Sequence, residues 1–285
     1  MNVDLERQEI VTPAAGRRLW LRELLRAMRP KQWSKNIILF FGLIFALRLS
    51  DPRAVGLSLA AFAIFCAVSS AVYLINDIAD VEKDRRHPVK RHRPLAAGIV
   101  RPSEAWAAAV VLLLVALPLA FAINRTFGML TLTYLALMIA YSYVLKHLVL
   151  LDVFAIAAGF VIRAAAGAVA IDVPISPWLY VCTILGALFL GLSKRRHELL
   201  LLNDDAGHHR RILEHYSTTL LDQLIMIVTA STVMAYSLYT FSAENLPKNH
   251  AMMITIPFVL YGIFRYLYLV HRKDAGGSPE EVLLR

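Results

Sequence analysis

The sequence predicts an all-α membrane protein with several transmembrane helices, and three observations support this fold class. Hydrophobic residues make up 58% of the 285 residues, well above the roughly 45–50% of an average soluble domain. The mean hydropathy is +0.56. Apolar runs divide the chain, and most have close to the roughly 20 residues that span a bilayer. These runs lie at about 36–49, 54–75, 104–123, 127–145, 148–170, 177–193, 220–241 and 251–270.

Basic residues are concentrated in every second segment that joins these runs, and this distribution predicts the orientation of the helices in the membrane. Lysine and arginine collect on the cytoplasmic side of membrane proteins. The N-terminus, every second connecting segment and the C-terminus hold most of them, whereas the opposite segments are short and poor in charge. We therefore expect eight helices with both chain ends in the cytoplasm. The two long polar segments, 76–103 and 194–219, lie on that side and can cover a site.

The regions outside the apolar runs differ in character. Residues 1–18 are polar and lack the apolar core of a signal peptide, so we expect a disordered cytoplasmic N-terminus. Residues 19–30 place leucines on one helical face with arginines beside them, the pattern of an amphipathic helix in the membrane interface. A single transmembrane domain would span residues 31–272, followed by a polar C-terminal segment at 273–285. The formal charge of +9 suits anionic headgroups or phosphorylated ligands.

The segment Leu74–Arg93, LINDIADVEKDRRHPVKRHR, concentrates polar residues at the end of an apolar run. On a continuous helix, Asn76, Asp77, Asp80 and Asp84 would share one side, because they fall at offsets 0, +1, +4 and +8. Clustered carboxylates near a helix C-terminus need a compensating cation. Magnesium is commonly held by one or two carboxylates with water and substrate phosphates. We interpret the three aspartates as ligands of a magnesium–diphosphate; the alternative is a solvated helix end.

Several cations elsewhere suit the remaining phosphate oxygens, each with a simpler alternative. Lys35 can point at a ligand or reach the lipid headgroups. The basic residues after the aspartates can bind phosphate or only fix the topology. In the second polar segment, Lys194 and Glu198 can form a surface pair, and a zinc site among Asp204, Asp205, His208 and His209 is less expected. The cations interpreted as phosphate ligands are Lys35, Arg85, Lys90, Arg91, Arg93, Arg163, Lys194 and Arg195.

Arg163 lies inside an apolar run, three helical turns after Asp152. An unpaired arginine at that depth is costly, so we expect its side chain to face the bundle interior and either pair there or bind an anion. Ala164 to Gly167 follow it and predict close packing between helices.

The chain resembles the UbiA superfamily of intramembrane prenyltransferases over most of residues 30–272, since NDIADVEKD fits the motif NDxxDxxxD. The stretches RPKQWSKN, NDIADVEKDRRHPVKRHRPLAAG, YSYVLKHLVLLD, GFVIRAAAG and KRRHEL are similar to its decaprenyl-phosphate phosphoribosyltransferase branch. The resemblance implies a helix bundle with a cytoplasmic polar cavity open to lipid. It also implies that Asp77, Asp80 and Asp84 act on the magnesium–diphosphate of phosphoribosyl pyrophosphate. The implied substrate-binding set is Asn76, Lys35, Asn36, Arg85, Lys90, Arg91, Arg93, Tyr141, Lys146, Arg163, Lys194, Arg195 and Glu198.

Three departures from the superfamily pattern stand out. Residues 194–222 contain no second DxxxD motif, which leaves a second aspartate-held metal open. Ser142 stands where the YxxxK motif ending at Lys146 has tyrosine. The ninth helix of the family has no apolar run here, so we expect a form with about eight helices.

The resemblance implies transfer of 5-phosphoribosyl from phosphoribosyl pyrophosphate to a polyprenyl phosphate, with release of diphosphate, for cell-envelope arabinan precursors. The expected setting is the plasma membrane, with the active site facing the cytoplasm, a possible homo-oligomer and no nucleic-acid partner. One alternative is prenyl transfer from a prenyl diphosphate to an aromatic acceptor. Another is a lipid or ion-coupled transporter in which Arg163 and Asp152 form a coupling pair.

Overall fold

We describe the protein from a computed structural model, for residues 13–174, 177–202, 211–242 and 250–272. In these ranges every regular element is helical, and the predicted all-α membrane fold is confirmed. The elements are α1 (Pro13–Ala27), η1 (Pro30–Phe40), α2 (Phe41–Phe45), α3 (Pro52–Ala79), α4 (Val81–Arg86), η2 (Lys90–His92), α5 (Pro102–Ile123), α6 (Arg125–Tyr143), η3 (Leu145–His147), α7 (Leu151–Ala170), α8 (Pro177–Leu202), η5 (Arg211–His215), α10 (Thr218–Ser242), η6 (Ala251–Thr255) and α11 (Ile256–Arg272).

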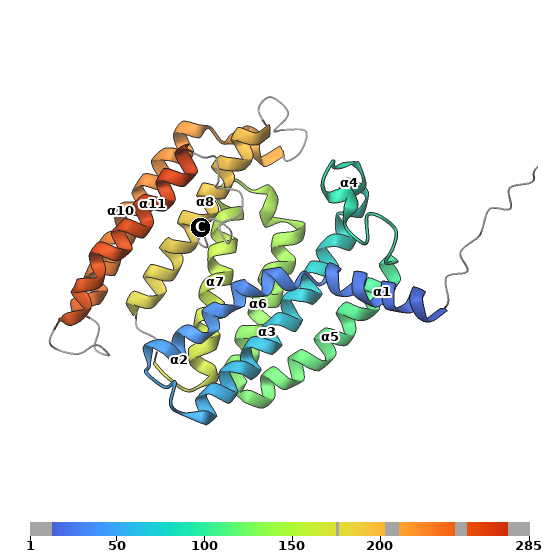
Figure 1. The fold of residues 1–285 in the computed structure, drawn as a ribbon, viewed down its shortest axis with the longest axis horizontal. Helices are drawn as coiled ribbons and strands as arrows, with labels where there is room; N and C mark the ends of the chain where they lie inside the picture. Colours follow the sequence, from blue (N-terminus) through green and yellow to red (C-terminus); the bar gives the residue numbers. More distant parts are fainter. Residues whose placement is uncertain (1–12, 175–176, 203–210, 243–249, 273–285) are drawn as a thin grey trace, which may run out of the picture.

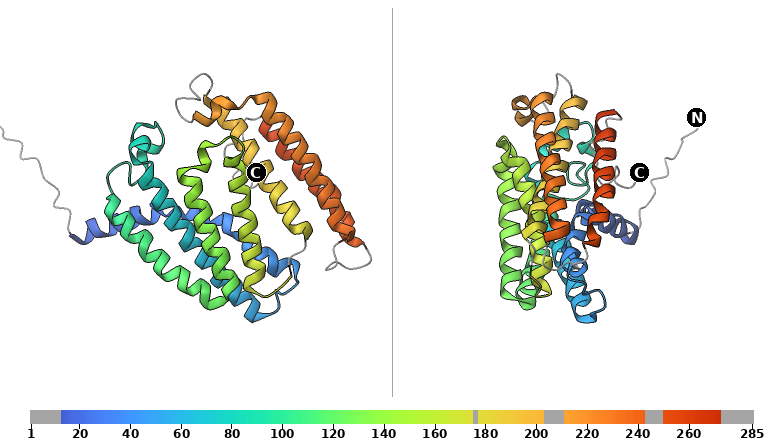
Figure 2. Two further views of the ribbon diagram at one scale, coloured as in Figure 1. Left: turned by 180° about the vertical axis from the view of Figure 1, so that it is seen from behind. Right: turned by 90° about the vertical axis from the view of Figure 1, so that its left-hand side faces the viewer.

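The long helices pack mostly against their neighbours in sequence (Figure 1). The helix α5 lies between α3 and α6, and α7 lies between α6 and α8. The pair α10 and α11 lies beside α8 at one edge, as the left view in Figure 2 shows. The 3-10 helix η1 departs from this order, because it packs against both α3 and α7. Through these contacts, η1 lies against the central helices of the bundle.

Six helices in the described ranges are long and apolar enough to span a membrane. They contain the predicted runs 54–75, 104–123, 127–145, 148–170, 220–241 and 251–270, with shifts of a few residues at their ends. The run 177–193 is also helical, within α8. The chain is therefore a multi-pass membrane protein.

The first apolar run, 36–49, is not one continuous α-helix. Its residues form the end of η1, which has 11 residues, and α2, which has five. A 3-10 helix rises about 2.0 Å per residue and an α-helix about 1.5 Å. The two together extend over roughly 30 Å, close to the hydrocarbon thickness of a bilayer.

Small residues bring this first segment close to α7. A β-carbon added to Gly167 would lie 1.9 Å from the carbonyl oxygen of Leu39, and one added to Gly42 would lie 2.7 Å from the α-carbon of Ala168. Such distances leave no room for a side chain. The predicted close packing around residues 164–167 is confirmed, and its partner is η1.

Three boundaries differ from the predicted ones. The helix α1 begins at Pro13, inside the segment expected to lack structure, and proline is favoured at a first helical position. The helix α8 continues to Leu202, so Lys194 to Glu198 lie on its last turns and not in a loop. The third difference is a break after Ala79. The predictions for residues 1–12 and 273–285, and for zinc ligands at 203–210, lie outside the described residues.

Candidate active site

The break in the helix after Ala79 shapes the aspartate motif. Asp80 has φ −100° and ψ 6°, which ends α3, and α4 begins at Val81. Asp77 lies on the last turn of α3 and Asp84 on α4. Both carboxylates are almost fully buried, at 2% and 4% exposure. Burial of two negative charges requires cationic partners.

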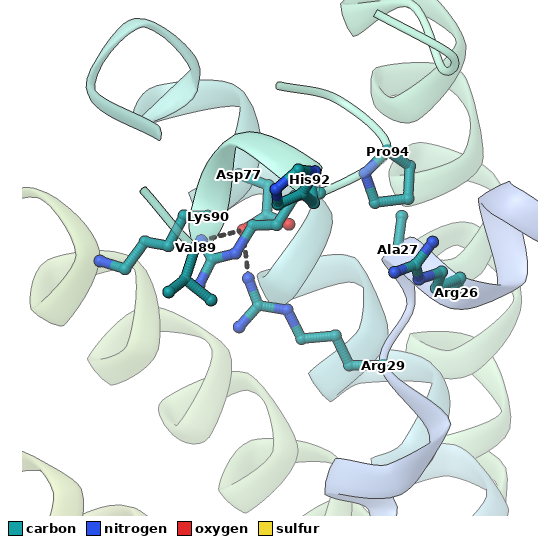
Figure 3. Close-up of a pocket in the computed structure, with 9 residues that line it drawn as sticks. Arg26, Ala27, Arg29, Asp77, Val89, Lys90, His92 and Pro94 are labelled. Atoms are coloured by element: carbon teal, nitrogen blue, oxygen red, sulfur yellow. Dashed lines mark hydrogen bonds and ion pairs between the residues drawn. The ribbon is translucent and has the colours of Figure 1, made fainter. Parts of the chain in front are cut away.

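Arginines supply that compensation in this structure. Arg93 Nη1 lies 3.2 Å from Asp77 Oδ1 and 2.6 Å from Asp84 Oδ2, so one guanidinium joins the two carboxylates. Arg29 Nη2 also donates to Asp77 Oδ1. Figure 3 shows the Arg29 side chain directed at Asp77. The predicted role of Arg93 beside the aspartates therefore has a geometric basis.

Asp80 points to a different partner. Lys146 Nζ lies 3.0 Å and 2.9 Å from the two oxygens of Asp80, across 66 residues of sequence. The expectation that three carboxylates face one small volume is therefore wrong for Asp80 in this structure. The expectation failed because the helix breaks at Asp80, and residues at offsets 0, +1, +4 and +8 share one side only along a continuous helix.

The residues fit a divalent metal through two of the three aspartates. Among the described residues, no three His, Cys, Asp or Glu side chains are close enough together to hold a metal. However, oxygens of Asp77 and Asp84 converge on a single cationic atom of Arg93. Magnesium commonly takes one or two carboxylates and completes its shell with water and phosphate oxygens. Asp77 and Asp84 meet that requirement, and ligation by Asp80 stays a prediction.

Arg29 is a site residue that the sequence did not reveal. We assigned it to an interfacial helix, whereas its guanidinium reaches Asp77 and lies 4.8 Å from the ring centre of Tyr73. The neighbouring carbonyl of Met28 accepts a hydrogen bond from Ser70 Oγ at 3.2 Å. Ser70 in turn accepts one from Trp33 Nε1 at 3.0 Å. The sequence feature that could have indicated this role is the position of Arg29 directly before Pro30, as the first residue of the RPKQWSKN stretch.

A cavity of about 260 Å³ opens beside Asp77, between the end of α1 and η2. Lys90 and Arg93, two of the predicted phosphate ligands, line it together with Arg29 (Figure 3). Two further predicted ligands from the same polar segment lie outside this lining. Arg85 pairs with Glu82 at 2.7 Å, and Arg91 is exposed on η2.

A second polar centre lies deep in the bundle around Arg163, which is 5% exposed. Its Nε donates to Asn36 Oδ1 at 2.8 Å, its Nη2 to Tyr134 Oη at 2.6 Å, and its Nη1 to the carbonyl of Gly159 at 3.2 Å. In the part of the chain that the structure describes, these acceptors are all neutral. Arg163 thus faces the interior, as predicted, and joins Asn36 from η1. Lys35 and Tyr141 are half-buried.

A third polar centre joins α7 and α8. Arg195 Nε lies 3.0 Å from Asp152 Oδ2 as an ion pair, and Arg195 Nη1 donates to Glu198. Both Asp152 and Arg195 are buried, at 0% and 3% exposure. The pairing of Arg163 with Asp152 expected for a transporter is therefore wrong, because Arg195 takes that carboxylate. Lys194 is half-buried one residue earlier.

Tyr216 completes the third centre from the segment before α10. Its hydroxyl donates to Asp152 Oδ1 at 3.0 Å and accepts from the backbone N–H of Leu150 at 2.8 Å. Leu150 has a left-handed backbone, with φ 67°. Burial raises the pKa of Tyr216 to about 12. The neutral hydroxyl therefore persists across the physiological range and holds this turn in place.

Tyr216→Phe is expected to destabilise the protein at pH 7 by about 1–3 kcal/mol, since Asp152 and Leu150 each lose a buried partner. The folded-state pKa of Tyr216 is raised above the ordinary value of 10.0. Its contribution is therefore complete below pH 10 and is lost as the pH rises toward about 12. Thermal unfolding in detergent at pH 7 and pH 11 measures both effects.

The matched control is Tyr143→Phe, which changes an exposed tyrosine at the end of α6. It should leave the unfolding temperature unchanged at both pH values. Equal unfolding temperatures for Tyr216→Phe and the wild type at pH 7 would contradict the assigned role of Tyr216.

This chain is similar in sequence and in fold to known proteins. The profile described as the UbiA prenyltransferase family matches residues 36–280. The chain is 34% identical to proteins named decaprenyl-phosphate phosphoribosyltransferase from Mycobacterium tuberculosis H37Rv and Mycolicibacterium smegmatis. Each alignment covers 92% of this chain, with 87% and 86% of the relatives. A solved UbiA homologue from Archaeoglobus fulgidus, bound to GPP and Mg²⁺, shares the fold. Its TM-score is 0.73 at 20% identity, covering 92% of this chain and 93% of that one.

Proposed function

The chain belongs to the UbiA prenyltransferase family, and we propose that it transfers the 5-phosphoribosyl group of phosphoribosyl pyrophosphate to a polyprenyl phosphate, releasing diphosphate. The observation that carries this proposal is the 34% identity, over 92% of the chain, to relatives named for that activity. The excess of cations around the buried aspartates supports it. The product would feed cell-envelope arabinan synthesis at the plasma membrane, with the site on the cytoplasmic side.

The donor diphosphate would bind beside Asp77 and Asp84. These two aspartates would hold magnesium, which supplies electrostatic stabilisation of the departing diphosphate when it is bound. Arg93 lies between the same two carboxylates, within 3.2 Å of both. Its guanidinium is thereby placed to donate to diphosphate oxygens, for which the forked arrangement of N–H groups is suited.

The acceptor phosphate is already an anion, so the reaction needs no strong general base. In the transfer, the bond between the anomeric carbon and the diphosphate oxygen breaks, and a bond from that carbon to a lipid phosphate oxygen forms. The negative charge moves to the diphosphate, where the cations act. Arg163 and Lys194 are the cations we assign to positioning one of the two remaining phosphates, either that of the acceptor or that of the ribose 5-position.

The last turns of α8 favour phosphoribosyl over prenyl transfer. The superfamily pattern implies a second DxxxD motif in this region, and residues 194–222 have none. Lys194, Arg195 and Arg196 begin that stretch instead, and Arg195 is bound to Asp152. The donor has a diphosphate and a 5-phosphate, and the acceptor has a lipid phosphate. Cationic side chains suit these three anionic groups better than a second pair of carboxylates does.

Prenyl transfer to an aromatic acceptor is the second candidate, because a solved structure of the same fold binds GPP and Mg²⁺. The test uses purified protein in lipid nanodiscs with radiolabelled phosphoribosyl pyrophosphate and decaprenyl phosphate. A parallel reaction contains geranyl diphosphate and 4-hydroxybenzoate. We expect a phosphoribosylated lipid by mass spectrometry and diphosphate release in the first reaction alone. Product in the second reaction alone would overturn the proposal.

A further inference from the structure

The lining of the cavity beside Asp77 holds more cations than carboxylates. Arg26, Arg29, Lys90 and Arg93 line it, with His92 beside them and Asp77 as the one carboxylate of its lining (Figure 3). Arg26 also pairs with Glu23 at 3.3 Å, but its side chain stays 62% exposed. Arg29 and Arg93 pair with Asp77, and Arg93 also pairs with Asp84. The cations of the lining still outnumber these carboxylates, and the excess positive charge favours an anionic ligand.

The size of the cavity limits that ligand. Its volume is about 260 Å³, below the roughly 300–1,000 Å³ of pockets that enclose drug-sized molecules. A phosphate with its ester-linked carbon chain or part of a sugar fits such a volume.

The helix α1 is fixed against the bundle, so its arginines are held in position. Trp20 Nε1 donates to Glu104 Oε2 at 3.0 Å, which ties α1 to the first turn of α5. Ala27 is 1% exposed and packs in a cluster with Leu95, next to η2. An amphipathic helix that only lay in the interface would not need this polar contact to a transmembrane helix.

The backbone of Arg29 is strained at the point where the cavity forms. It has φ 55° and ψ 62°, the left-handed conformation, which is unfavourable for a residue other than glycine. Strain of this kind persists where the surroundings fix it and is common at ligand sites. Here the conformation turns the chain from α1 into η1 and directs the guanidinium toward Asp77.

We propose that this cavity binds a phosphomonoester dianion and that α1, through Arg26 and Arg29, forms part of the substrate site. The inference deepens the proposed function and rests on it. Two sources supply this chemistry in the proposed reaction, the 5-phosphate of the ribosyl donor and the terminal phosphate of the lipid acceptor. The same cations serve either one, and a binding experiment distinguishes them.

The test titrates purified protein in nanodiscs with ribose 5-phosphate and, separately, with nonyl phosphate, and measures each Kd by calorimetry. Arg26→Gln is expected to weaken binding of at least one of them about tenfold, the loss of one charge-assisted hydrogen bond. Arg29→Gln should weaken the same ligand. Arg26→Lys should restore part of the affinity. The matched control Arg22→Gln, an exposed arginine one turn earlier on α1, should bind as the wild type does.

Each outcome decides between the alternatives. Weaker binding of ribose 5-phosphate alone assigns the cavity to the donor, and weaker binding of nonyl phosphate alone assigns it to the acceptor. Wild-type affinity for both ligands in Arg26→Gln and Arg29→Gln overturns the site. An equal loss in Arg22→Gln also overturns it, because the effect is then one of surface charge. If Arg26-dependent binding is found without phosphoribosyl transfer by the wild type, the proposed function fails and the phosphomonoester site stands.

Discussion

Asp84→Asn is expected to lower phosphoribosyl transfer by at least about 100-fold, since the metal-held leaving group loses one of its two converging carboxylates. Asp77→Asn should have a loss of the same size. Both aspartates are buried and share Arg93, at 3.2 Å and 2.6 Å. The substitution keeps the shape of the side chain and removes only the charge. Diphosphate release and lipid product, measured in nanodiscs at saturating magnesium, give the rate.

Glu82→Gln is the matched control for this prediction. Glu82 lies on the same short helix α4, two residues before Asp84, but its side chain is 71% exposed and pairs only with Arg85 at the surface in the described structure. A surface pair of this kind contributes little, so the variant should transfer at the wild-type rate. Wild-type turnover by Asp84→Asn, with unchanged helix content by circular dichroism, would refute the assignment of the metal ligands.

Hydropathy predicted most of these helices, because a span of about 20 apolar residues is what a bilayer requires. The first segment was predicted only in part. It forms a 3-10 helix of 11 residues followed by an α-helix of five. A hydrophobic pattern does not reveal the close approach of Gly167 to the Leu39 carbonyl, because this contact is a tertiary one.

The aspartate site shows where local spacing ceases to be informative. Asp77 and Asp84 were correctly brought together, but the position of Asp80 depended on a helix that in fact ends there. Lys146 pairs with Asp80 at a separation of 66 residues in sequence, and Arg29 pairs with Asp77 at a separation of 48. Ion pairs at such separations follow from tertiary packing, so a sequence rule for neighbours three or four residues apart cannot predict them.

Arg163→Met is expected to lower transfer by about 10- to 100-fold, the equivalent of 1.5–3 kcal/mol for a lost charge-assisted hydrogen bond to an anion. Guanidinium has five N–H groups, and three of them donate to Asn36, Tyr134 and Gly159 in the described structure. A buried cation with neutral partners only is costly in a membrane protein. If Arg163 binds a substrate phosphate, that phosphate supplies the missing negative charge.

The comparison with Arg163→Lys separates this role from a structural one. Lysine keeps the charge but cannot hold three fixed acceptors with the planar fork of arginine. If Arg163 attracts an anion, Arg163→Lys should recover much of the activity that Arg163→Met loses, with the difference appearing in the KM of one phosphorylated substrate. If Arg163 only joins η1 to α6 and α7, the two variants should unfold at similarly lowered temperatures and lose activity together. The kinetic constants and unfolding temperatures of both variants in nanodiscs therefore decide whether the charge or the geometry of Arg163 is what the bundle requires.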